Sequence, residues 1–178
     1  MLYGSNFILN CTSKKEEFVI YPFIHSTSNH ENEEDMFRAV RVPDKLALDV
    51  VPEDGDFSMS AGEFTEVYTN EKDSFDGIVT CFFLDTANNI FNYVDTITNI
   101  VKPGGMWINL GPLLYHYKDA LDQVSVQISW KQLTQYIKSK GFIGLEEEKW
   151  ETTYCHDPTS SYTHIYRCVL SVWRKGSE

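Results

Sequence analysis

An acidic side chain that could act on a small molecule closes an apolar run in the middle of the chain. Residues 78–84 are apolar or small, and Asp85 follows them directly. An apolar run that stops at a charged residue predicts a parallel strand buried on both faces. Open α/β sheets bind ligands at the carboxyl ends of such strands, so we expect Asp85 to reach a ligand cleft.

Other candidate side chains lie on neighbouring segments, and each has a structural alternative. Asp85 could instead cap the helix that follows it, and on this pattern alone the two interpretations are equally good. His116 ends the apolar loop GPLLYH, where an exposed loop histidine is an equal alternative. Cys81 lies inside the apolar run, a typical place for an inert core thiol. Tyr154 and Tyr166 lie on predicted strands, where aromatic residues are common.

Composition and charge limit the classes of partner. The chain has 178 residues, of which 42% are hydrophobic, and a formal net charge of −11. This indicates one globular domain with a substantial core. Nucleic acids and anionic membranes are bound mainly through Lys and Arg, so the negative charge argues against both. We expect a small-molecule or protein partner.

The cysteines and the lack of targeting signals favour a cytoplasmic protein. There are four cysteines and no CxxC motif: Cys11, Cys81, Cys155 and Cys168. No signal peptide is recognisable, and no apolar run approaches the roughly 18 residues of a membrane span. The spacing of Cys155, His156, His164 and Cys168 fits none of the usual zinc patterns, so we predict no metal site.

The first third of the chain has weak signals. Residues 1–12 carry apolar side chains at helical spacing, and residues 18–24 contain Pro22, which predicts an extended edge or loop. Residues 26–55 are polar and acidic and predict a long surface loop. Residues 57–64 alternate at first and predict a short strand beside the one at residues 76–85, with one helical turn at residues 65–68.

The remaining two thirds show clearer periodicity. Residues 88–101 predict an amphipathic helix that ends at the turn of residues 102–105, before a strand at residues 106–110. Residues 129–140 predict a second such helix, with Ser129 as N-cap and Gly141 just past the end. Residues 142–154 and 164–173 predict two strands that pair antiparallel. This order predicts an α/β fold whose twisted sheet ends in an antiparallel hairpin.

Several long strings in this order are similar to one enzyme family. FSMSAGEF, DGIVTCFFLDTANN, KPGGMWINLGPLLYH and the terminal YRCVLSVWRK resemble the carnosine N-methyltransferases, which are Rossmann-like methyltransferases. The similarity covers nearly the whole chain. It implies S-adenosyl-L-methionine as cofactor and methylation of the imidazole ring of carnosine, giving anserine, or of a related histidine-containing dipeptide. It also implies a cytoplasmic or nuclear location, and leaves a homodimer open.

One part of the family pattern is absent from this sequence. Family members carry a glycine-rich turn after the first strand, which contacts the cofactor, and no GxGxxG-like stretch occurs here. We therefore expect residues 1–178 to be a single incomplete methyltransferase domain, the C-terminal portion of the fold. The alternative is a non-catalytic binding or regulatory module that lacks the cofactor-binding turn.

The resemblance assigns three residues to the cofactor. Glu63 and Phe64 match an acid and an aromatic residue that contact the adenine, although the family usually has Asp at the position of Glu63. Cys81 matches a cofactor-contacting position on the next strand.

Five further residues match the substrate side. Asp85 matches the acid that holds the substrate imidazole, and His116 matches a substrate-contacting histidine. The resemblance also implies an aromatic group that lines the dipeptide pocket, formed by Tyr154, His164 and Tyr166. The family more often has Tyr at the position of His164.

Overall fold

The structure, a computed structural model, describes residues 2–52, 54–55 and 57–177, and it divides into two compact units. The N-terminal unit comprises Met1–Ala61 and Cys155–His164, and the sheet unit comprises Gly62–Tyr154 and Ile165–Glu178. The chain therefore passes from one unit to the other more than once. Each unit is described below by itself.

The N-terminal unit is built from short elements. The helix predicted at its start is confirmed as α1, and the extended segment after it contains the short strand β1. The predicted surface loop at residues 26–55 is wrong in part, because it contains a strand that pairs antiparallel with β1, and two short helices. The elements are α1 (Leu2–Asn10), β1 (Phe18–Ile20), α2 (Glu33–Met36), β2 (Val40–Val42) and α3 (Ala47–Val50). Asn32 and Asp35 form a capping box that begins α2, so part of the acidic run is helical.

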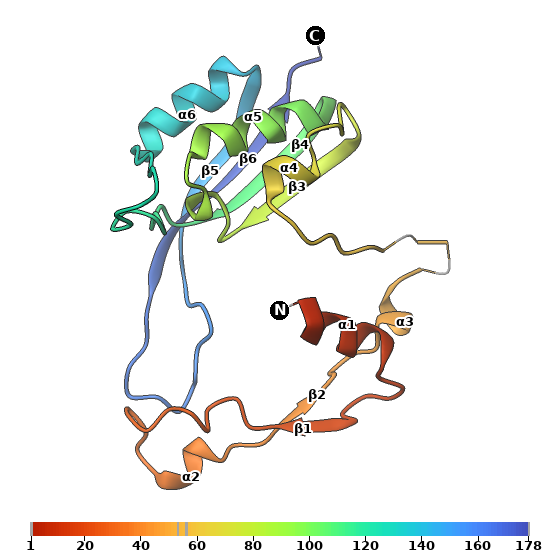
Figure 1. Cartoon of the computed structure of the whole chain (residues 1–178), viewed down its shortest axis with the longest axis vertical. Coiled ribbons are helices and arrows are strands. Elements are labelled where there is room, and N and C mark those ends of the chain that lie inside the picture. The colour runs from red at the N-terminus through yellow and green to blue at the C-terminus, as the bar shows by residue number, and fades with distance from the viewer. Residues whose placement is uncertain (1, 53, 56, 178) are drawn as a thin grey trace. The chain divides into compact units, whose positions relative to one another are not determined.

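The sheet unit contains a four-stranded mixed sheet in the order β3-β4-β6-β5. Strands β3 and β4 are parallel, whereas β6 pairs antiparallel with both β4 and β5. The α/β class and the antiparallel terminal hairpin are thus confirmed (Figure 1). The elements are α4 (Phe64–Val67), β3 (Phe75–Cys81), the 3₁₀ turn η1 (Leu84–Thr86), α5 (Ile90–Ile100), β4 (Val101–Gly111), α6 (Trp130–Ser139), β5 (Phe142–Thr152) and β6 (Tyr166–Lys175).

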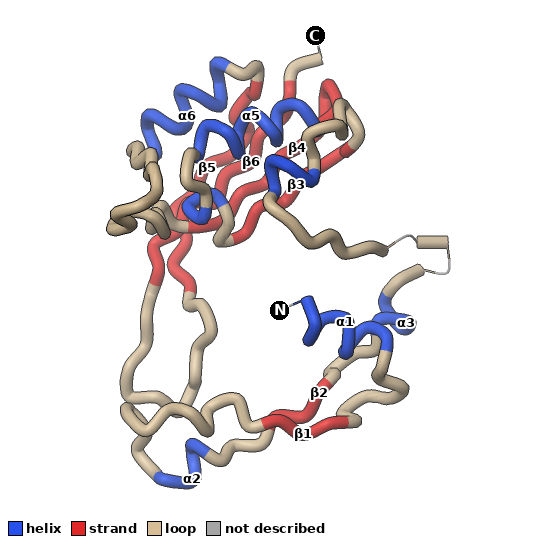
Figure 2. The backbone as a smooth tube through the Cα atoms, in the orientation of Figure 1, coloured by secondary structure: helices blue, strands red, loops and turns tan. Residues whose placement is uncertain are grey.

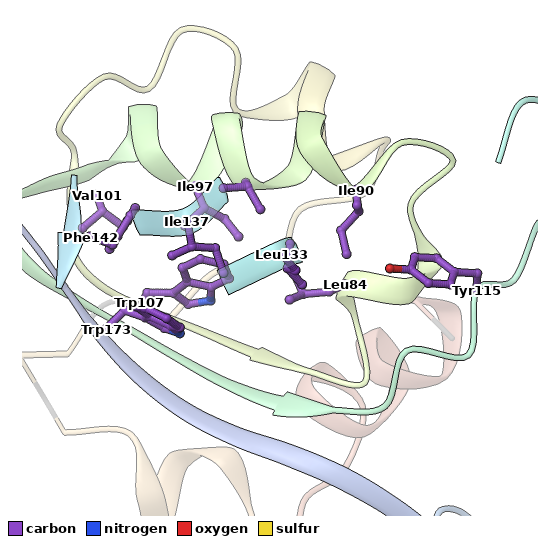
Figure 3. Close-up of a cluster of buried hydrophobic side chains, with 11 residues drawn as sticks. Leu84, Ile90, Ile97, Val101, Trp107, Tyr115, Leu133, Ile137, Phe142 and Trp173 are labelled. Carbon is purple, nitrogen blue, oxygen red and sulfur yellow. The ribbon is translucent and has the colours of Figure 1, made fainter. Parts of the chain in front are cut away.

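Two amphipathic helices cover one face of this sheet. Asn89 caps α5, and Ser129 caps α6 in a capping box with Gln132, as predicted for Ser129. Figure 3 shows their apolar side chains lying over the two sheet tryptophans, Trp107 and Trp173. The fully buried helix residues are Ile90, Val94, Ile97, Leu133 and Ile137. Burial of each such side chain stabilises the fold by about 1.5–3 kcal/mol.

The strand predicted at residues 57–64 is wrong. Residues 57–61 have no regular structure, and Phe57 and Met59 are 58% and 50% exposed. Gly62 has a φ of 153°, outside the range of an L-residue strand, and Glu63 then caps α4 through the N–H of Glu66. The helix cap at Glu63, and not the short alternation of apolar and polar residues before it, therefore determines the local structure. The single helical turn predicted beside it is confirmed as α4.

The prediction that this strand, β3, is buried on both faces is also wrong for the described residues. Thr80 is 4% exposed on the face under the helices, whereas its neighbour Val79 is 72% exposed. The reason is that the helices of this unit pack on one face only. The turn predicted at residues 102–105 lies inside β4, where the register with β3 shifts between Val101 and Met106. Gly104 supplies a φ of 79° within this irregularity.

Lys175 joins β6 to the C-terminal end of α5. Its Nζ donates to the carbonyls of Thr98 and Val101 at 2.7 and 2.6 Å, and to Asp73 Oδ1 at 2.9 Å. The side chain is 15% exposed. The ammonium thus satisfies carbonyl groups that the end of a helix leaves unpaired.

We predict that Lys175→Met lowers the free energy of unfolding by about 2 kcal/mol, because charged hydrogen bonds to partly buried carbonyls are lost. Urea denaturation measures this change. Asp73→Asn is the matched control: it removes the ion pair and keeps both carbonyl contacts, so we expect a smaller loss. Equal losses in the two variants would show that the ion pair dominates.

The uncovered face of the sheet generates a second prediction. Val79 and Ile108 are neighbours in register and are 72% and 36% exposed, and β3 lies at one edge of the sheet. Exposed apolar strands at a sheet edge promote association. We expect the chain to self-associate at micromolar concentration in sedimentation velocity, and Val79→Lys to reduce this. Leu121→Lys, at a fully exposed position away from the strands, should leave it unchanged.

Candidate substrate and cofactor site

Asp85 lies in the connection between β3 and α5. Strand β3 ends at Cys81, so the prediction that Asp85 closes the strand itself is wrong, and Asp85 lies in the 3₁₀ turn Leu84–Thr86. The interpretation of Asp85 as a helix cap is wrong as well, because the side chain of Asn89 caps α5 by accepting from Phe91 N–H at 3.1 Å. Helix capping therefore does not explain why this carboxylate is buried.

Two backbone N–H groups from the loop after β4 bind Asp85. Leu114 N–H donates to Asp85 Oδ2 at 2.8 Å, and His116 N–H donates to the carbonyl of Asp85 at 3.0 Å. The residue is 2% exposed. Burial raises the pKa of this carboxyl group above its usual range, and the Leu114 N–H and nearby His116 oppose the rise. The loops after the two parallel strands are thus joined at one carboxylate.

His116 lies beside Asp85, on a loop that its neighbour Tyr115 anchors. The phenol of Tyr115 donates to the carbonyl of Ile128 at 2.7 Å and accepts from the Ile128 N–H at 3.2 Å. Tyr115 is buried, whereas His116 is exposed. The structure therefore brings two predicted substrate residues, Asp85 and His116, to adjacent connections, and leaves the imidazole of His116 accessible.

The two predicted tyrosines meet at a residue that the sequence did not single out. The ring of Phe82 lies 5.0 Å from that of Tyr154 and 5.4 Å from that of Tyr166, measured between centroids. Phe82 directly follows β3, in the connection that carries Asp85. The sequence gives no separate signal for Phe82, because it lies inside the apolar run at residues 78–84 and looks like one more strand residue.

His164 lies in the N-terminal unit, where its ring is 4.8 Å from that of Tyr162. It belongs to the long loop between β5 and β6, drawn in tan in Figure 2. The other predicted substrate residues belong to the sheet unit. A shared site with His164 therefore stays a prediction.

The three predicted cofactor residues line two cavities of the sheet unit. Phe64 and Cys81 lie on a largely apolar cavity of about 440 Å³ along β3, with Phe83 on its wall. Glu63 lines a polar cavity of about 320 Å³ together with Tyr93 and other residues of the α5 start. The Glu63 carboxylate also accepts from the Thr65 hydroxyl and the Glu66 N–H, as an N-cap. Cys81 is exposed, which contradicts the alternative of a core thiol.

These cavities suit the two chemical parts of a nucleoside. An apolar wall accepts a purine ring, while a carboxylate and phenols offer hydrogen bonds to polar groups. Phe64 packs edge-on against Phe83 at 5.1 Å and against Tyr93 at 5.2 Å, so contacts with these two rings fix its position in the wall. The residues present therefore fit an adenosine-containing cofactor on the side of the sheet that this chain supplies.

Among the described residues, no three His, Cys, Asp or Glu side chains gather as ligands for a metal ion. No helix among them is long and apolar enough to cross a membrane.

A mixed α/β sheet with a buried carboxylate in the connection that follows a parallel strand defines an α/β protein with a candidate ligand site at that edge of the sheet. The chain belongs to the carnosine N-methyltransferase family, whose family model matches residues 1–177. The match spans both compact units of the chain. The expectation from the sequence that the chain is one incomplete domain stays a prediction.

The curated relatives that this chain matches are longer than the chain. The carnosine N-methyltransferase of Rattus norvegicus is 42% identical over 98% of this chain and 44% of its own length. That of Dictyostelium discoideum is 46% identical over 97% of this chain and 37% of its own length. The chain thus spans less than half of either relative. A solved SAM-dependent methyltransferase from Methanosarcina mazei is 13% identical, covers 65% of this chain and 66% of its own, and has a TM-score of 0.46.

The raised pKa of Asp85 makes stability depend on pH. Because the folded state binds this proton more tightly than the unfolded state does, the stabilisation is complete below the unfolded pKa and is lost as pH rises through the raised folded pKa. Asp85→Asn removes this titration and keeps an oxygen for the Leu114 N–H. We therefore predict a melting temperature a few degrees above wild type at neutral pH, with a difference that shrinks on acidification.

Thermal unfolding of both proteins across pH measures this difference. Asp119→Asn, an exposed acid on the loop after His116, is the control and should shift nothing across the same range. A difference between Asp85→Asn and wild type that does not change with pH would show that the carboxyl group has an ordinary pKa.

Proposed function

We propose that the protein of which this chain forms part or all transfers a methyl group to an imidazole ring nitrogen of carnosine, giving anserine, or of a related histidine-containing dipeptide. The observation that carries the proposal is the buried Asp85 carboxylate, held by Leu114 N–H at 2.8 Å beside an accessible His116. Membership of the carnosine N-methyltransferase family supports the choice of substrate class.

Asp85 would fix the tautomer of the substrate. A carboxylate that accepts the N–H of one imidazole nitrogen leaves the lone pair of the other nitrogen free to attack. The same carboxylate stabilises the positive charge that develops on the ring, the part that an orienting acid also plays for a catalytic histidine. Its burial strengthens both effects, because few waters compete for its oxygens.

The methyl donor we propose is S-adenosyl-L-methionine, whose sulfonium supplies an activated methyl group. Phe64 and Cys81 would contact its adenine from the apolar cavity, and Glu63 would accept a hydrogen bond from the neighbouring polar one. Most of the rate enhancement would come from orientation and electrostatics, with little acid–base work by the protein.

The rest of the dipeptide would bind to hydroxyl and imidazole groups. Tyr154 and Tyr166 offer phenol donors, and His116 offers a ring nitrogen, to the peptide and carboxylate oxygens. We place His164 in this set on the resemblance alone. Free histidine lacks the β-alanyl portion and therefore the binding energy that this portion contributes, so carnosine should be the better acceptor.

The test is methyl transfer from labelled S-adenosylmethionine by the full-length gene product that contains this chain. We predict that Asp85→Asn keeps cofactor affinity but lowers turnover of carnosine by about 100-fold or more, because an amide stabilises imidazolium poorly. Asp119→Asn is the matched control and should keep full turnover.

Competing acceptors distinguish the alternatives. Carnosine, free histidine and a histidine-containing protein are offered together, and the methylated position is read by mass spectrometry. Label found mainly on protein, or outside the imidazole, would overturn the dipeptide assignment. Binding of carnosine without any transfer would favour a non-catalytic module.

A further inference from the structure

Phe82 has a backbone conformation that is unusual for an aromatic residue. Its φ is 49°, in the left-handed region that bulky side chains rarely adopt. Such strain persists only where the surrounding structure maintains it, and it gathers at ligand sites. Phe82 follows the last residue of β3, at the carboxyl end of a parallel strand.

Strand β4 maintains this conformation. Phe82 N–H donates to the carbonyl of Leu110 at 2.8 Å, which continues the parallel ladder by one step. The next residue of β4, Gly111, has no side chain, and a Cβ there would lie 3.2 Å from the nitrogen and 3.3 Å from the Cα of Phe82. Glycine at this position therefore allows the close approach of the two backbones.

The left-handed turn brings the ring of Phe82 to the tyrosines. In β3, the alternation of burial places Thr80 under the helices and Val79 and Cys81 on the open face. An extended Phe82 would follow Thr80 toward the helices, but its ring instead contacts Tyr154 and Tyr166. The contact with Tyr166 is edge-to-face, with an interplanar angle of 88°. Phe82 and Tyr166 are half-buried and Tyr154 is 56% exposed, so the cluster remains accessible.

The geometry points to Phe82 as a further substrate-contacting residue, which with Tyr154 and Tyr166 forms an aromatic surface for an imidazole ring that becomes positively charged. This rests on the proposed function. In the transfer, the lone pair of the ring nitrogen forms the new N–CH₃ bond, and the electron pair of the S–CH₃ bond stays on sulfur. The ring carries the positive charge until its other N–H gives the proton to water. Aromatic faces attract such cations, most strongly where water is excluded.

Graded fluorination of Phe82 tests this role. Fluorine withdraws electron density from the face of the ring with little change in its shape, so packing against Tyr154 and Tyr166 is kept. In the full-length gene product, we expect single-turnover methylation of carnosine to slow stepwise from phenylalanine through 4-fluoro- to 3,4,5-trifluorophenylalanine, by about tenfold in all. The same series at Phe91, whose ring lies 4.4 Å from that of Tyr136 on α5 and α6, should have no effect.

Each outcome decides the matter. Full transfer at every fluorination step would overturn the role of Phe82 and leave the proposed function intact. If the wild type transfers no methyl group to carnosine, the proposed function fails, and titration with 1,3-dimethylimidazolium then tests the aromatic surface by itself. Affinity for this cation that falls with fluorination at position 82 supports the surface, and affinity that stays constant overturns it.

Discussion

The hydrogen bond from Leu114 N–H to the Asp85 carboxylate, with its companion from His116 N–H to the Asp85 carbonyl, fixes the candidate site. It joins the connections that follow the two parallel strands. Without it, the buried carboxylate would lose a hydrogen bond that offsets its desolvation, and the loop that carries His116 would lose one of its anchors. Other anchors are the phenol of Tyr115, which binds the backbone of Ile128, and the Val126 N–H, which donates to the carbonyl of Asn88. The position of His116 depends on these contacts.

Burial of the Asp85 carboxylate opposes stability, and in the proposed function it would aid the transfer reaction. Desolvation disfavours the charged form, as the raised pKa of Asp85 shows, and the apolar core offsets this cost. That core is formed where α5 and α6 cover Trp107 and Trp173, on one face of the sheet. A substrate N–H that reaches the carboxylate would replace the hydration that folding removed. Under the proposed function, stability and turnover would therefore make opposite demands on this residue, as is common at active sites.

Much of the sheet unit could be predicted from the sequence, because its signals are physical and local. The 3.6-residue period of the apolar residues predicts α5 and α6, and the N-cap Ser129 and the glycine at position 141 predict the ends of α6. The strand predicted at residues 57–64 does not form, because four alternating residues do not make a strand without a partner. The resemblance to the family identifies the candidate site residues, but it does not give their geometry. Nothing in the amino-acid sequence indicates that Asp85 lies beyond the strand in a 3₁₀ turn, or that Phe82 adopts a left-handed conformation.

The strand order has a consequence for how the sheet is assembled. Strand β6 is the last of the described strands in the sequence, yet it lies inside the sheet, between β4 and β5. During synthesis on a ribosome, β5 has no partner until β6 emerges. Until then, one side of β4 in the parallel pair β3-β4 is also unpaired. Nascent chains with unpaired strands are exposed to aggregation and to chaperones. The folding of this sheet should therefore be completed late, in one step that joins its two halves.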